Sequence, residues 1–151
     1  MGDFLGAFAL IKREQRYLFV ANERQIHGAS RRVWDLPGGR VEPAELLHEA
    51  LRRELREETR LEVVGAPELA FVQEGERLVG GLRRHAWRSF FFIVDVSGEP
   101  RADSEVLDVR WMTEREIHAE CSAPYHDSFR AWLERGGSHF ISRWEDAGEL
   151  D

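Results

Sequence analysis

The sequence predicts a mixed α/β or α+β fold, because several segments with strand composition alternate with a few helical ones. Strands are expected at 4–11, 16–21, 33–36, 61–64, 69–73, 89–96 and 106–112, and helices at 43–59, 114–118 and 126–135. The chain has 151 residues and shows no repeat and no linker-like run. A single domain over residues 1–151 is therefore expected.

The first half of the chain shows how these elements are recognised. Residues 4–11 are apolar and small, as in a buried strand, and the polar run 13–15 separates them from the strand at 16–21. The polar stretch 22–32 is expected to form a loop. Pro37-Gly38-Gly39 then breaks regular structure, and Pro43 is suited to the first turn of the helix that follows.

Composition excludes several classes of protein. The net charge is −7, from 21 basic and 28 acidic residues, which argues against a nucleic-acid partner. The longest apolar run, 4–11, is too short to span a bilayer, so no membrane partner is expected. Cys121 is the single cysteine and cannot form an intrachain disulfide, which points to a reducing, cytoplasmic location.

The helix at 43–59 carries the strongest chemical signal. On a helical wheel its apolar stripe continues into the three carboxylates Glu54, Glu57 and Glu58, while arginines occupy the opposite arc. An ordinary solvated helix with Glu–Arg pairs explains the outer acids but not these three. Burying three like charges costs several kcal/mol unless a cation compensates them. Carboxylate oxygens suit a hard divalent cation such as Mg²⁺, so a metal site is predicted here.

A cation held in this way can bind substrate phosphates through its open positions. It would then polarise a phosphoryl oxygen, activate a water and neutralise the leaving phosphate. The pair Gly38-Gly39 precedes the helix and would let a backbone carbonyl approach the metal closely.

The spacing of these residues matches a known motif. The matching positions are Gly39, Glu45, Arg53, Glu54, Leu55, Glu57, Glu58 and Leu61. They agree with eight of the nine specified positions of the Nudix box, G-x5-E-x7-R-E-U-x-E-E-x-G-U, where U is aliphatic. The run Trp34-Asp35-Leu36-Pro37-Gly38-Gly39 also looks like that family's approach to the box. The chain resembles a MutT-like Nudix hydrolase.

This resemblance implies an α/β/α sandwich with a mixed sheet. It also implies Mg²⁺ or Mn²⁺ bound by the three glutamates and the Gly38 carbonyl, with Arg53 and Glu45 positioning the carboxylates. Nudix enzymes hydrolyse the pyrophosphate bond of a nucleoside diphosphate linked to another moiety, so a nucleotide-type small molecule is the expected partner. The predicted catalytic residues are Arg53, Glu54, Glu57 and Glu105.

Glu105 is included among the predicted site residues because a further carboxylate is needed to hold a second ion or accept a proton from water. Glu74, Glu76 and Glu99 are other acids in the later loops, but Glu105 lies six residues before Trp111. In Nudix enzymes a carboxylate of similar placement reaches back over the metal helix. The alternative is that Glu105 is a solvated loop acid.

Arg60 departs from the box, because a glycine is specified at its position. That glycine ends a helix, often with a left-handed backbone, where an arginine costs on the order of 1 kcal/mol. Its charge near the helix C-terminus offsets part of that cost. We expect an altered helix exit or an altered stability, and an intact metal site.

Substrate contacts are expected from residues around Gly80-Gly81, namely Arg84, Trp87 and Arg88. They could bind phosphates or stack a base. The alternative is a solvated hairpin whose glycine pair forms the turn. The tail at 136–151 either covers the sheet or forms a contact in a homodimer, so a monomer and a homodimer both stay open.

Three functional classes are compatible with these features. The hydrolase is favoured over a Nudix-fold module that binds or senses a nucleotide without efficient cleavage, because all three glutamates are present. A plain interaction domain with a charged helix is disfavoured by the helical wheel. The substrate itself depends on loops and does not follow from the fold.

Overall fold

The computed structural model describes residues 3–146. Its elements, in chain order, are β1 (Phe4–Leu10), β2 (Lys12–Arg13), β3 (Arg16–Ile26), β4 (Ala29–Asp35), β5 (Gly38–Arg40), α1 (Leu47–Thr59), β6 (Glu62–Val79), β7 (Leu82–Ser97), β8 (Asp108–Met112), α2 (Glu114–Glu120), the short 3₁₀ helix η1 (Pro124–His126), α3 (Asp127–Arg135) and β9 (His139–Asp146).

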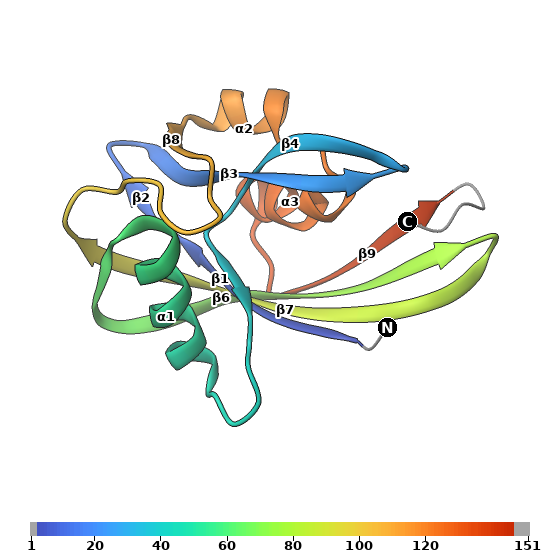
Figure 1. Ribbon diagram of the computed structural model, residues 1–151, viewed down its shortest axis with the longest axis horizontal. Coiled ribbons are helices and arrows are strands. Elements are labelled where there is room, and N and C mark those ends of the chain that lie inside the picture. The colour runs from blue at the N-terminus through green and yellow to red at the C-terminus, as the bar shows by residue number, and fades with distance from the viewer. Residues whose placement is uncertain (1–2, 147–151) are drawn as a thin grey trace.

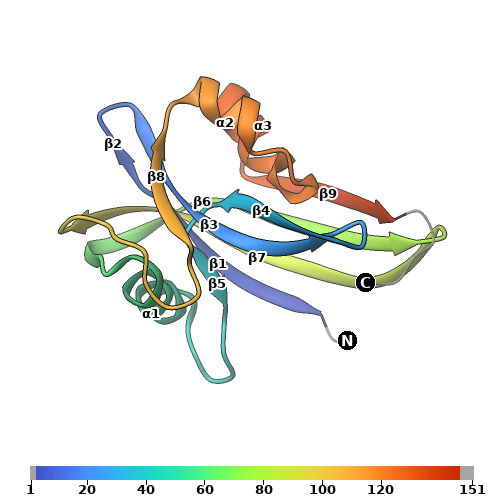
Figure 2. The ribbon, with the colours of Figure 1, turned by 45° about the horizontal axis from the view of Figure 1, so that its top comes forward.

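Two sheets form the centre of the molecule. The first is mixed, with the order β5-β1-β7-β6-β9, in which β1 runs parallel to β7 and β6 parallel to β9. In the second, β3 pairs antiparallel with β2, β4 and β8. The sheets lie between α1 on one side and α2 with α3 on the other (Figures 1 and 2). The predicted α/β/α architecture with a mixed sheet is confirmed.

Side chains on the two faces of β1 pack in two different hydrophobic clusters. Ala7 and Ala9 pack in a cluster with Leu51 and Leu55 of α1, whereas Leu10 belongs to the cluster that contains the aromatic core. In that second cluster the rings of Phe71 and Phe91 are stacked, with their centroids 4.3 Å apart. The small side chains on one face of β1 let α1 approach the sheet closely.

Two predictions about local structure are wrong. The helix begins at Leu47 rather than at Pro43, because residues 43–44 form a turn in which Ala44 has a φ of 67°. Residues 22–32, expected as a loop, continue β3 and β4 as a hairpin around His27 and Gly28, whose φ values are 50° and 77°. Cross-strand pairing over polar positions outweighs their composition there.

The second half of the chain contains a long hairpin. The strands expected at 61–64 and 69–73 are one strand, β6, whose pairing with β7 shifts register between Val64 and Glu68. Gly80 and Gly81 form the tip with φ values of 60° and 79°, so the turn interpretation of this glycine pair is confirmed. The described part of the tail forms β9, which extends the sheet beside β6. No helix within residues 3–146 has the length and hydropathy needed to cross a membrane.

Candidate active site

Two of the three box glutamates face inward from α1. Glu54 is 16% exposed and Glu58 is also partly buried. Glu57 is 51% exposed, so the expectation that all three acids lie on the buried stripe is wrong for this residue. Its position at the edge of the stripe lets the side chain reach solvent while it stays one helical turn from Glu54 and Arg53.

The glycines of β5 make room for these carboxylates. The backbone N–H of Gly38 donates a hydrogen bond to Oε1 of Glu58, with N and Oε1 2.8 Å apart. A Cβ atom on Gly39 would lie 2.7 to 2.9 Å from the carboxylate atoms of Glu54. The two glycines therefore allow α1 to bring its acidic side chains directly against the β5 backbone.

Arg53 connects the acidic residues to one another. Its guanidinium donates to Glu45 (Nε to Oε2, 2.7 Å), to Glu54 (Nη1 to Oε1, 3.0 Å) and to the carbonyl of Arg40 (3.0 Å). A longer contact of 3.3 Å reaches Glu57. The hydrogen bonds from Arg53 and from the backbone N–H of Glu42 hold the pKa of Glu45 at about 2. Arg53 is thus hydrogen-bonded to several acids at once, and the positioning role that the resemblance implies for it stays a prediction.

The partly buried carboxylates of Glu54 and Glu58 are not fully compensated by nearby positive charge. Desolvation, together with the charge of Glu54, raises the pKa of Glu58 to about 8, against the hydrogen bond from Gly38. Desolvation also raises the pKa of Glu54, in spite of Arg53. Two adjacent acids whose pKa values are raised by burial are a donor set that fits a divalent cation.

The three carboxylates are not assembled around a common point. Among residues 3–146, no three His, Cys, Asp or Glu side chains converge as a ready-made metal site. Glu54 and Glu58 lie against β5, and Glu57 turns toward Arg53 and solvent. The assignment of Gly38, Glu54, Glu57, Glu58 and Glu105 as ligands therefore stays a prediction.

The loop between β7 and β8 packs on the C-terminal end of α1. The N–H of Asp103 donates to the carbonyl of Glu58 (3.0 Å), and that of Arg101 to the carbonyl of Thr59 (3.1 Å). Arg60 has the left-handed conformation, with a φ of 65°, and its guanidinium pairs with Asp103. Glu105 follows two residues later and is exposed. This loop thus brings Glu105 to the α1 side of the molecule, and its catalytic role stays a prediction.

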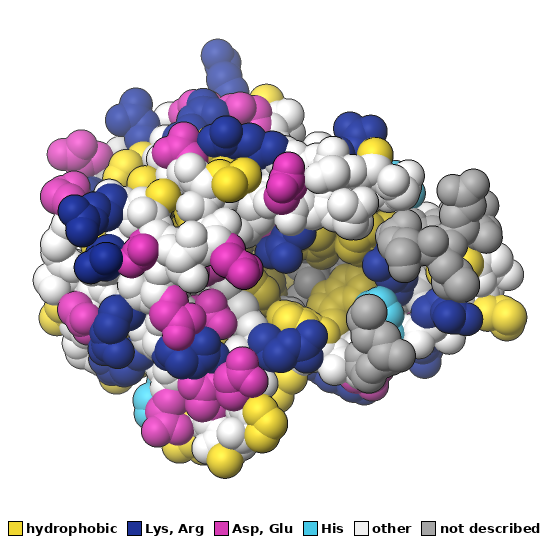
Figure 3. Space-filling view, in the orientation of Figure 1, with side chains coloured by type: hydrophobic (Ala, Val, Ile, Leu, Met, Phe, Trp, Pro, Cys, Tyr) yellow, Lys and Arg dark blue, Asp and Glu magenta, His cyan; other side chains and the backbone are white. Residues whose placement is uncertain are grey.

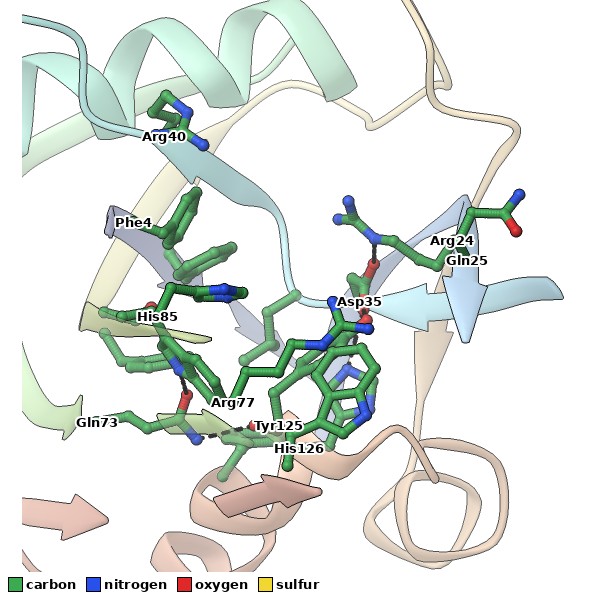
Figure 4. Close-up of a pocket in the computed structure, with 17 residues that line it drawn as sticks. Phe4, Arg24, Gln25, Asp35, Arg40, Gln73, Arg77, His85, Tyr125 and His126 are labelled. Carbon is green, nitrogen blue, oxygen red and sulfur yellow. Dashed lines mark hydrogen bonds and ion pairs between the residues drawn. The ribbon is translucent and has the colours of Figure 1, made fainter. Parts of the chain in front are cut away.

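A cavity of about 340 Å³ opens beside this acidic site. Figure 3 shows it as a hollow with hydrophobic side chains at its base and basic ones along its edge. Its aromatic lining comes from Phe4, Phe8, Trp87, Phe91, Tyr125, Phe129 and Trp144, and its basic lining from Arg24, Arg40, Arg77, His85 and His126 (Figure 4). The volume is within the usual range of small-molecule sites.

Arg40 and Arg24 link the cavity to the acidic helix. Arg40 lines the cavity, and its carbonyl accepts a hydrogen bond from Arg53. Arg24 lies close enough to Glu58 for its charge to lower the pKa of that acid. A molecule in the cavity can therefore extend toward α1 past two arginines.

Asp35 is the buried polar centre of the cavity wall. Its carboxylate accepts hydrogen bonds from Tyr125 (2.7 Å), Asn22 (3.0 Å) and Arg24 (Nε, 3.1 Å), and lies 3.0 Å from Nε2 of His126. Burial alone would raise the pKa of Asp35, but the interactions with His126, Arg24 and Asn22 hold it well below its usual range. The carboxylate is saturated by these groups.

Gln73 fixes the cavity floor. Its Oε1 accepts from the indole Nε1 of Trp87 (2.8 Å), and its amide nitrogen donates to Ser128 (2.7 Å) and to the carbonyl of Tyr125 (2.9 Å). Both ends of the amide are used, so Trp87 is held in one orientation.

The predicted substrate-binding residues are separated in space. Trp87 lines the cavity, whereas the cavity lining does not include Arg84 or Arg88. Arg84 is exposed on the hairpin, and Arg88 pairs with Asp3. Substrate binding by these three residues stays a prediction. Burial raises the pKa of the Cys121 thiol to about 12.

Several cavity residues were not predicted from the sequence. They are Arg24, Asp35, Gln73, Tyr125, His126 and Trp144. Asp35 lies inside the run that approaches the box, but its role depends on partners up to 91 residues away along the chain. Arg24 falls in the segment that looked like a loop, and Trp144 in the tail.

Comparisons with known proteins agree with this architecture. The family model of the NUDIX domain matches residues 4–133. The uncharacterized Nudix hydrolase YfcD of Escherichia coli (strain K12) is 31% identical over 113 residues, which are 73% of this chain and 60% of that protein. The CTP pyrophosphohydrolase of the same organism is 36% identical over 81 residues, 52% of this chain and 56% of that protein. The matches thus span little more than half of these two relatives.

The fold also matches solved structures. The MutT protein of Bacillus halodurans superimposes with a TM-score of 0.76 at 19% identity, over 98% of this chain and 93% of that one. At this identity the likeness concerns the fold, and the chemistry must be argued from the site.

Proposed function

Because the chain belongs to the NUDIX domain family, we propose that it is a Mg²⁺-dependent hydrolase that cleaves the pyrophosphate bond of a nucleoside diphosphate linked to another moiety. The observation that carries the proposal is the placement of the Glu54 and Glu58 carboxylates against the glycines of β5. The site lies next to a cavity large enough for part of a nucleotide.

The ligands proposed for Mg²⁺, or Mn²⁺, are Glu54, Glu57, Glu58 and the Gly38 carbonyl, with Glu105 as a further candidate. A bound cation would supply positive charge that stabilises the charge developing on the phosphate oxygens. The raised pKa values of Glu54 and Glu58 support this assignment, because a cation would stabilise the charged form of both acids. Arg53 would hold Glu54 in position.

The cavity supports a nucleotide rather than a bare phosphate chain. Aromatic faces suit the base, and Arg24 and Arg40 lie between the cavity and α1, where phosphates attached to that base would pass. The name of one relative, CTP pyrophosphohydrolase, agrees with a nucleotide as substrate class. Water would attack phosphorus at the end of the substrate that lies over α1.

The experiment is a substrate panel with and without Mg²⁺. It contains nucleoside triphosphates, dinucleoside polyphosphates, nucleotide sugars and ADP-ribose, and product nucleotides are measured by chromatography. We expect Mg²⁺-dependent release of a nucleoside monophosphate from at least one class. Tight binding of a nucleotide without turnover across the panel would contradict the hydrolase and favour the binding or sensing module.

A further inference from the structure

The strand β9 lies beyond the part of the chain that the family model matches. That match ends at residue 133, and β9 covers His139–Asp146. The strand pairs in parallel with β6 from Val72↔His139 to Val79↔Asp146, and Figure 1 shows it along the outer edge of the sheet. This element is thus an addition to the matched domain that reaches the edge of the cavity.

The period of two along β9 sends alternate side chains inward. Phe140 packs edge-to-face on Phe71, with ring centroids 5.4 Å apart, and the hydroxyl of the buried Ser142 donates to Asp127 (3.0 Å). Trp144 is the next residue on this face and lines the cavity. Ile141, on the opposite face, is 76% exposed. The packing of Phe140 and Ser142 fixes where Trp144 lies.

Three side chains form what we call the β9 wall: Arg77, Tyr125 and Trp144. Arg77 is paired with Trp144 across the β6–β9 ladder, and its guanidinium carbon lies 4.4 Å from the centroid of the indole ring. The ring centroids of Tyr125 and Trp144 are 5.9 Å apart. Figure 4 shows Arg77 and Tyr125 on the same side of the cavity as Asp35. The rings of Tyr125 and Trp144 and the guanidinium of Arg77 thus line one side of the cavity together.

The polar groups around this wall favour hydrogen-bond acceptors on the ligand. Asp35, the one carboxylate that residues 3–146 contribute to the lining, is saturated by its four partners. The other charged side chains of the lining are Arg24, Arg40 and Arg77, all hydrogen-bond donors. A flat ring with carbonyl or ring-nitrogen acceptors on its edge matches such a lining, whereas a cationic group does not.

We propose that the β9 wall binds the base of the substrate nucleotide, with Trp144 as the stacking surface, so that this added strand determines which bases are accepted. The inference rests on the proposed function for the kind of ligand. The wall residues lie on β6, η1 and β9, outside the acidic helix, so their contribution to binding can be measured without the reaction.

Calorimetric titration in the absence of divalent cations tests this directly. A panel of nucleoside 5′-monophosphates is compared with ribose 5-phosphate, which has no base. The wild type should bind at least one nucleotide about tenfold more tightly than ribose 5-phosphate, and Trp144→Leu should remove about that factor. The affinity for ribose 5-phosphate should not change, and Trp144→Phe should keep most of the affinity for the nucleotide.

The matched control is Ile141→Ser, on the outward face of the same strand, which should bind both ligands as the wild type does. The proposal would be overturned if Trp144→Leu lost affinity for the nucleotide and for ribose 5-phosphate by the same factor. It would also be overturned if this variant bound the nucleotide with wild-type affinity. A wild type that binds the two ligands equally would also overturn it. The proposed hydrolase is judged separately, by turnover with Mg²⁺.

A measurement on the wild type covers the case in which Trp144→Leu does not fold. The indole N–H resonance of Trp144, assigned with Trp144→Phe, should shift when the nucleotide is added. It should not shift with ribose 5-phosphate. A resonance that is indifferent to the nucleotide would contradict stacking on Trp144.

Discussion

Gly38 in β5 and Glu58 in α1 are joined by a hydrogen bond from the backbone N–H to the carboxylate Oε1, 2.8 Å in length. The two residues are 20 positions apart, with Gly38 just before the first residue of the box and Glu58 near its end. The bond draws the buried end of α1 onto β5, where Gly39 leaves space for Glu54. The glycines of β5 and the acidic residues of α1 thus pack directly against one another.

Gly39→Ala tests the need for that space. The added Cβ would meet the flexible carboxylate of Glu54, not the backbone, so the side chain should move while the fold survives. A catalytic group displaced by about 1 Å can cost about 100-fold in rate, and we expect a loss of that order. Turnover across a Mg²⁺ titration, with thermal unfolding as a check on folding, measures it. An unchanged titration curve would show that Glu54 does not need its present position.

The left-handed backbone at Arg60 predicts that glycine is more stabilising than alanine at this position, the reverse of their order inside a helix. At a left-handed position, Arg60→Gly should unfold with a free energy about 1 kcal/mol higher than Arg60→Ala, since both variants lose the pair with Asp103. Inside α1 the order reverses, because alanine favours a helix more than glycine does. The free energy of unfolding of Arg56→Ala should therefore be about 1 kcal/mol higher than that of Arg56→Gly. Urea denaturation of the four variants gives the comparison. The same order at both positions would refute the backbone explanation.

Asp35 should make the stability depend on pH in the acid range. Its pKa is lowered in the folded protein, so its contribution is present above the unfolded pKa of about 3.9 and disappears as pH falls toward the folded value. Asp35→Asn should lower the unfolding free energy by about 3 kcal/mol at pH 7, because a buried set of donors loses its charged acceptor.

The difference between Asp35→Asn and the wild type should then shrink below about pH 4, where unfolded Asp35 takes up a proton. Denaturant titrations at pH 7, 5 and 3 measure it. Asp108→Asn, which removes an exposed partner of Arg32, is the control and should change stability little. A constant difference over this pH range would count against the assigned pKa shift.

Glu105→Gln separates three roles for this loop carboxylate. As the acceptor of a proton from water, Glu105 contributes about 100-fold or more to the maximal rate, and added Mg²⁺ does not restore that loss. As a metal ligand it shifts the Mg²⁺ dependence, and high Mg²⁺ recovers most of the rate. Glu99→Gln, an exposed acid of the same loop, is the control. Coincident curves for wild type and Glu105→Gln would leave Glu105 as a surface residue.

The sequence predicts the parts of this molecule that depend on local spacing. The end of α1 at Thr59, the turn at Gly80-Gly81 and the mixed architecture follow from helix periodicity, glycine placement and strand composition. The inward placement of Glu54 and Glu58 follows from the same periodicity. The exposure of Glu57 does not, because it lies at the edge of the stripe, where small rotations decide between core and solvent.

The cavity could not be predicted, since it is built from contacts distant in the chain. Asp35 and His126 are 91 residues apart, and Arg77 meets Trp144 only because β9 adds to β6 in parallel. Nothing in the local composition of the tail specifies that pairing. The hairpin of β3 and β4 was missed for a related reason, because its polar positions, including Arg24, pair along an exposed edge.

The rate of Mg²⁺-dependent pyrophosphate cleavage in Glu57→Gln tests the central claim most directly. Glu57 is half exposed, so the substitution should leave the fold intact, and the exposed Glu68→Gln on β6 is the matched control. Loss of one metal-bound charge, worth several kcal/mol, should lower turnover by at least about 100-fold while Glu68→Gln keeps the wild-type rate. A Glu57→Gln protein that turns over at the wild-type rate in modest Mg²⁺ would contradict the account.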